Sequence, residues 1–116
     1  MRTPGGRPSK RWIMAWVVLL AAGLFEVVWA VGLKFLNGFE KPGLLIFVVG
    51  AIVLSMALLS LAMKSIPMGT AYAIWTGIGI LGTFILGVLF FEESMNWVKI
   101  LSCVLILAGL IGLKLA

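Results

Sequence analysis

Four long apolar segments, almost free of charged side chains, follow one another along the chain. A helix needs about 20 apolar residues to cross the roughly 30 Å hydrocarbon core of a bilayer. Three segments meet that length. The fourth does so when Lys99 and Lys114 near its ends extend their ammonium groups toward the headgroups. The pattern predicts an all-α integral membrane protein with transmembrane helices over about 12–34, 44–63, 68–91 and 96–114.

Short connections join the predicted helices, so consecutive helices are expected to run antiparallel. Proline marks two boundaries, at Pro42 and Pro67, because it disfavours helix in the residue before it. Outside the first 11 residues, the end that carries both termini has two lysines and the opposite end has three. This near balance favours neither orientation under the positive-inside rule.

Residues 1–11 differ from the rest of the chain because they hold four of its nine Lys and Arg residues, two glycines and two prolines. We expect a disordered basic tail there, followed by one four-helix domain over 12–116. Without the tail the net charge falls from +5 to +1. Such a tail is typical of contact with anionic lipid and favours the N-terminus inside. Met14 could serve as the initiating residue instead, which leaves the status of 1–13 open.

The composition agrees with a membrane protein and argues against other classes. Hydrophobic residues make up 63% of the chain and charged residues 11%, against about 45–50% and 25% in soluble domains. No basic patch interleaved with aromatic side chains predicts nucleic-acid binding. The chain has no histidine, and Cys103 is its one cysteine. The sequence contains no metal cluster, phosphate loop or nucleophile–base set, so we expect neither an enzyme nor a cofactor.

Glu26 gives the strongest functional signal in the sequence. A carboxylate at the centre of a membrane helix costs roughly 2.5–3.5 kcal/mol on insertion scales, and such residues usually face an ion or substrate path. A structural alternative is a glutamate that pairs with a lysine. No Lys or Arg lies at comparable depth in any predicted helix, which favours the functional interpretation.

Two further residues share the face of Glu26. Trp29 follows it by three positions, and Gly23 precedes it by one turn. Trp29 is too deep in the predicted helix for an interfacial tryptophan. Gly23 is compatible both with a pocket and with close helix packing.

The third predicted helix carries an aromatic pair, Tyr72 and Trp75, with Thr76 and Gly79 on the same face. Aromatic faces attract cations, although an aromatic pair alone is more often ordinary packing. The buried carboxylate shifts the balance toward a cation site. Gly77 and Gly79 are expected to let this helix bend.

The second and fourth predicted helices carry weaker signals. Ser55 is expected either to hold Glu26 or a ligand, or to bond a carbonyl of its own helix. Ala108 and Gly112 form a small-xxx-small pattern, which is suited to a helix–helix dimer interface.

Three segments of the chain resemble the small multidrug resistance transporters. They read GLFEVVWAVGLK over 23–34, KSIPMGTAYAIWTGIG over 64–79, and GLIGLK over 109–114. The similarity extends from about residue 14 to the end of the chain. The combination of Glu26 with Trp29, Ser55 and Lys114 is similar to the guanidinium exporter subtype, whereas quaternary ammonium exporters share the glutamate and the Tyr–Trp pair.

The resemblance implies a multi-pass protein of a bacterial cell membrane. It also implies a homodimer of two oppositely inserted subunits, in which helices one to three line the pocket and helix four holds the dimer. No cofactor is implied. The basic tail departs from the usual start of the family.

A mechanism follows as a hypothesis, in which a guanidinium-type cation and protons compete for Glu26. Burial and the twin carboxylate both disfavour the charged form of Glu26. Trp29 and Ser55 would orient the carboxylate, and Tyr72 and Trp75 would pack on the cation. One alternative is a quaternary ammonium or multidrug exporter of the same family. An alternative of another class is a small passive channel or accessory membrane subunit.

Overall fold

The computed structural model describes residues 10–36 and 40–116. Those residues form four helices joined by short connections. Each helix is long and apolar enough to cross a membrane, which confirms the predicted all-α membrane fold. The helices are α1 (Lys10–Phe35), α2 (Pro42–Ala62), α3 (Met68–Phe90) and α4 (Trp97–Leu115).

The first helix begins two residues earlier than expected, because Lys10 and Arg11 are helical rather than part of the tail. Lys and Arg are good helix formers, and the glycines and prolines of the expected tail all precede them. The remainder of that expected tail, residues 1–9, lies outside the described residues.

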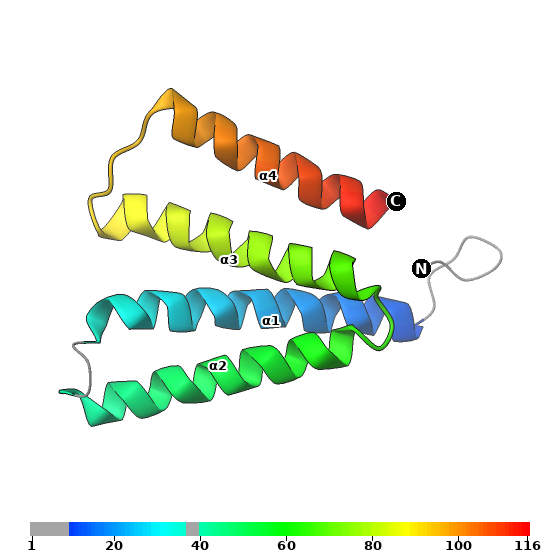
Figure 1. Ribbon diagram of the computed structural model, residues 1–116, viewed down its shortest axis with the longest axis horizontal. Coiled ribbons are helices and arrows are strands. Elements are labelled where there is room, and N and C mark those ends of the chain that lie inside the picture. Colours follow the sequence, from blue (N-terminus) through cyan, green and yellow to red (C-terminus); the bar gives the residue numbers. More distant parts are fainter. Residues whose placement is uncertain (1–9, 37–39) are drawn as a thin grey trace.

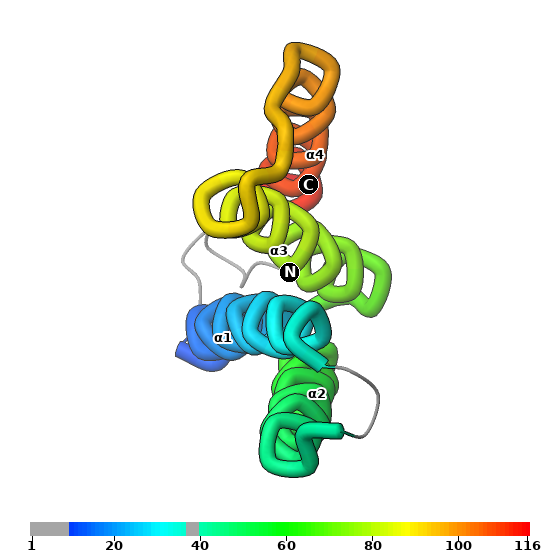
Figure 2. The backbone as a smooth tube through the Cα atoms, turned by 90° about the vertical axis from the view of Figure 1, so that its left-hand side faces the viewer, coloured from blue at the N-terminus to red at the C-terminus, as the bar shows by residue number. Residues whose placement is uncertain are grey.

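The four helices lie side by side in one row, in the order α2, α1, α3, α4 (Figure 1). Seen from its end, the row stays open and does not close into a bundle (Figure 2). The Cα atoms span 18 Å along the shortest axis, close to a single layer of helices. Among the described residues, α1 packs between α2 and α3, and the backbone of α4 approaches that of α3 alone. The row therefore leaves broad helix faces without a protein neighbour.

The α1–α2 contact is built from small and medium side chains that recur every three or four residues. This spacing places them on one face of each helix. Small side chains there let the two backbones approach closely. On α2 the buried residues are Val48, Ala51, Ser55, Leu59 and Ala62.

Glycines let α3 pack closely against both of its neighbours. A Cβ at Gly82 would meet the side chain of Val27 in α1, and a Cβ at Gly77 would meet Leu110 in α4. The structure therefore gives the α3 glycines a packing role. A bend at Gly77 and Gly79 stays a prediction, since α3 runs as one helix from Met68 to Phe90.

The outermost helix, α4, rests on α3 along a single stripe. It has no buried residue, and its half-buried positions recur at helical spacing, namely Lys99, Ile100, Cys103, Ile106 and Leu110. Asn96 caps its start, where the side-chain oxygen accepts a hydrogen bond from the Lys99 amide at 2.9 Å. The rest of the α4 surface is available for a partner or for lipid.

Candidate functional site

The α1–α3 contact surrounds the carboxylate of Glu26. Glu26 lies well inside α1 and is 9% exposed. Its carboxylate rests against the backbone of Gly79, where an added Cβ would overlap the Oε1 and Cδ atoms of Glu26. Gly79 thus provides the space that the carboxylate occupies. The sequence could not reveal this contact, because it depends on the rotation of α3 about its own axis.

The Oε1 atom of Glu26 is buried and has no hydrogen-bond partner among the described residues. A buried acceptor left without a donor costs about 1–3 kcal/mol, and native structures rarely leave one unexplained. The lysine partner of the structural alternative is also missing from the described part of the chain. An unpaired acceptor of this kind suits a proton or a cation that supplies N–H donors.

A chain of two hydrogen bonds joins three helices one turn before Glu26. The Ser55 hydroxyl donates to the Ala22 carbonyl at 2.7 Å, and the Trp75 Nε1–H donates to the Ser55 oxygen at 2.9 Å. Ser55 is fully buried. In an α-helix the Ala22 carbonyl is also the acceptor for the amide of Glu26, four residues on. The bonds therefore fix the backbone segment that carries the carboxylate.

This geometry differs from the expected bonds of Ser55 to Glu26 or to a carbonyl of its own helix, whereas its expected contact with a ligand stays a prediction. Its hydroxyl bonds neither Glu26 nor a carbonyl of α2, but a carbonyl of the neighbouring helix α1. The difference arises because Ser55 lies on the buried stripe of α2 that faces α1. Interhelical hydrogen bonds of this kind hold membrane helices together where the hydrophobic effect cannot.

The expected aromatic pair is present on α3, with its two rings in different environments. Tyr72 and Trp75 have ring centroids 5.5 Å apart and an interplanar angle of 50°. Trp75 is 5% exposed, whereas Tyr72 is 54% exposed. The pair thus reaches from the core to an open face of the helix row. The tyrosine ring is available there to a ligand or to a second chain.

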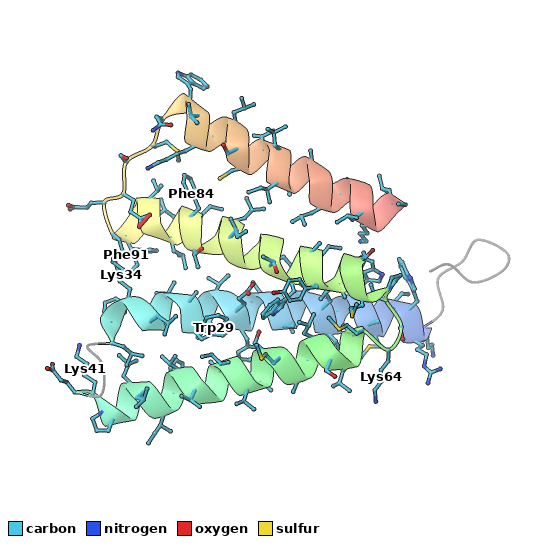
Figure 3. The ribbon with its side chains drawn as sticks, viewed as in Figure 1. Trp29, Lys34, Lys41, Lys64, Phe84 and Phe91 are labelled. Carbon is cyan, nitrogen blue, oxygen red and sulfur yellow. The ribbon has the colours of Figure 1, made fainter. Side chains whose placement is uncertain are left out.

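Trp29 and Thr76 each bring one more unpaired polar atom. The Nε1 of Trp29 and the Oγ1 of Thr76 are buried without a hydrogen-bond partner in the described part of the chain. Along the helix axes, Trp29 lies between Lys34 and Lys64 (Figure 3). These two lysines mark the opposite charged ends of the helices. Gly23, by contrast, packs closely, because an added Cβ there would lie 2.7 Å from the Ile78 side chain.

These groups do not line the cleft of about 520 Å³ that the described residues form. That cleft opens between α1, α3 and α4, and its lining includes Trp16, Ile74 and Lys114 but not Glu26. The Lys114 ammonium lies 5.2 Å from the centre of the Trp16 ring at that end of the row.

Comparison with known proteins places the chain among small membrane exporters. A family model described as Small Multidrug Resistance protein matches residues 14–106. The guanidinium exporter of Salmonella typhimurium is 57% identical over 103 residues, which cover 89% of this chain and 98% of that protein. The guanidinium exporters of Proteus vulgaris and Escherichia coli are 53% and 52% identical over the same length, and the alignments cover 99% and 98% of those proteins.

Proposed function

The chain belongs to the small multidrug resistance family, and from that premise we propose that it is a proton-coupled antiporter that exports guanidinium or a related small cation. It is a multi-pass protein of the bacterial inner membrane and a transporter rather than an enzyme. The substrate class is taken from the relatives, which are named guanidinium exporters.

One observation carries the proposal, namely the buried and unpaired Oε1 of Glu26. A guanidinium ion is planar and presents N–H donors on every edge, so a carboxylate can accept two parallel hydrogen bonds from it. Trp29, Tyr72, Trp75 and Thr76 are the side chains we assign to the walls of the site. The exposed ring of Tyr72 offers a π face to the cation.

Coupling follows from competition for one carboxylate. A proton and a cation cannot occupy the same carboxylate oxygen together, so we propose that the site takes up a proton when it holds no cation. Binding of the cation requires the charged form and therefore releases that proton. If two such carboxylates exchange two protons for one cation, one net charge crosses the membrane per cycle. The membrane potential then contributes about 2.3 kcal/mol per 100 mV.

We assign Ser55 a positioning role. Its hydroxyl links Trp75 to the Ala22 carbonyl, so it holds the wall of the site against the helix that carries Glu26. This role replaces the direct contact with the carboxylate that the sequence suggested. Gly79 belongs to the site as well, because it leaves room for the carboxylate.

A homodimer of oppositely oriented subunits would complete the site. The open row leaves Tyr72 facing outward, and Ala108 and Gly112 lie on the exposed side of α4. Apart from the backbone of its own helix and its chain neighbours, no described atom lies within 4 Å of a Cβ added at Gly112, so a second helix can approach closely there. Two subunits in opposite orientations also supply the inverted repeat on which alternating access depends.

The test is electrical. We expect purified protein in liposomes to give a current on rapid addition of guanidinium, and Glu26→Gln to abolish it. Glu40→Gln is the matched control, because Glu40 is an exposed carboxylate outside the helices, and it should keep the current. A current that survives Glu26→Gln would rule out exchange at this carboxylate.

The same recordings separate the alternatives. A larger response to a bulky quaternary ammonium ion than to guanidinium would indicate a drug exporter of the same family. A guanidinium flux that is independent of the proton gradient would indicate a passive channel. No flux of any cation would indicate an accessory membrane subunit.

A further inference from the structure

A second cleft, separate from the Glu26 site, lies between the start of α1 and the end of α2. Its volume is about 360 Å³. The residues that line it are Arg11, Met14, Ala15, Val18, Leu61, Lys64 and Ser65. The polar members come from the first turn of α1 and from the residues just after α2, whereas the apolar members lie inside the two helices.

The described side chains at this end of the helices carry positive charge only. Among the described residues, this end carries the four cations Lys10, Arg11, Lys64 and Lys114 and no Asp or Glu side chain. The opposite end carries three lysines and three glutamates, which balance one another. Arg11 and Lys64 therefore meet in one cleft without an acidic side chain at their end of the protein to neutralise them.

The lining of the cleft also changes from polar to apolar along the membrane normal. Val18 follows Arg11 by seven residues, which places it two turns, or roughly 10 Å, further along α1. Met14 and Leu61 are 57% and 51% exposed, so the apolar wall faces the lipid. A ligand that fits this arrangement has an anionic head at the membrane surface and a hydrocarbon chain that extends into the core.

We propose that this cleft binds one anionic glycerophospholipid, with the phosphate between Arg11 and Lys64 and an acyl chain along Met14, Val18 and Leu61. Basic side chains next to a membrane helix attract anionic headgroups, and the Ser65 hydroxyl adds a hydrogen-bond donor. The family model begins at residue 14, so Arg11 precedes the segment that this chain shares with the model.

The first test compares lipids by native mass spectrometry of the full chain in detergent. We expect phosphatidylglycerol to bind at least about tenfold more tightly than phosphatidylcholine with the same acyl chains, because only the former carries a net negative charge. Equal binding of the two lipids would overturn the proposal, because the cleft would then recognise hydrocarbon only. Displacement of phosphatidylglycerol by millimolar inorganic phosphate would overturn it as well, since the site would then be one for a free anion.

Variants then locate the site. The double variant Arg11→Gln and Lys64→Gln should weaken phosphatidylglycerol binding about tenfold or more. The matched control, Lys10→Gln with Lys114→Gln, removes the same charge from the same end and should retain the affinity. Equal losses in both pairs would overturn the proposal in favour of general surface attraction.

A third variant tests the apolar wall and leaves every charge in place. Leu61→Trp fills the cleft at an exposed position, so it should weaken phosphatidylglycerol binding without disturbing the core. Unchanged affinity in Leu61→Trp would overturn the placement of the acyl chain. Guanidinium currents are not needed for any of these readings, so the outcome is independent of the proposed transport function.

Discussion

Ser55 shows how one small side chain organises the surroundings of the candidate site. Its hydroxyl accepts a hydrogen bond from Trp75 and donates one to the Ala22 carbonyl, so it joins α2 to both α1 and α3. All three residues are buried. The indole N–H of a buried tryptophan can only donate. When its acceptor is removed, no water is present to replace that acceptor.

We predict that Ser55→Ala destabilises the site by about 1–3 kcal/mol, the cost of a buried donor left without an acceptor. Tryptophan fluorescence should report a change at Trp75, and the guanidinium current should fall. Ser60→Ala is the matched control, because Ser60 lies on the same helix but is exposed. If Ser55→Ala and Ser60→Ala behave alike in both measurements, the bond to Trp75 does not position the site.

At the scale of the element, the glycines of α3 allow this helix to pack closely against α1. Gly79 lies against the Glu26 carboxylate and Gly82 lies against Val27, so the two helices approach where α3 has no side chain. The carboxylate is thus confined by backbone rather than by a flexible side chain. Any group added at Gly79 must displace the carboxylate or separate the helices.

We predict that Gly79→Ala lowers the guanidinium current at least about tenfold, because relief of the overlap costs about 1–3 kcal/mol or moves Glu26. Gly50→Ala is the control, since a Cβ at Gly50 meets no atom within 4 Å. Both variants add one methyl group to a membrane helix, so the difference between their guanidinium currents reports the contact with Glu26. Full current in Gly79→Ala would show that the carboxylate does not depend on this space.

At the scale of the whole molecule, the four helices form an open row rather than a closed bundle (Figure 2). The outer helix α4 buries none of its residues, and within the described part of the chain its backbone approaches that of α3 alone. Its Ala108 and Gly112 lie about 200° around the helix from Leu110, which packs on α3. Such an outward row of small residues suits contact with a second copy.

We predict that Gly112→Leu raises the dissociation constant of a dimer at least about tenfold, because the added side chain keeps the two helices apart. Sedimentation or chemical cross-linking in detergent measures the change. Gly109→Leu is the control: its surroundings are equally open, but it lies about 100° around the helix from Ala108. A dimer that tolerates Gly112→Leu as well as Gly109→Leu would not be held by this row.

The sequence by itself determined the four membrane helices and the position of the one intramembrane carboxylate. Both follow from the bilayer, because length and apolarity alone decide whether a helix can span it. Glu26 stood out for the same reason, since a charge at that depth is costly. The apolar pattern predicts the start of α1 two residues too late, because the charged residues Lys10 and Arg11 are good helix formers and join the helix.

Only the tertiary structure decided which groups meet. Helical spacing places Ser55, Trp75 and Gly79 on faces of their own helices, but it does not say how α2 and α3 are rotated and shifted against α1. Those rotations give Ser55 the Ala22 carbonyl as acceptor and place Gly79 against Glu26. They are set by the packing of many small side chains at once, which no single stretch of sequence contains.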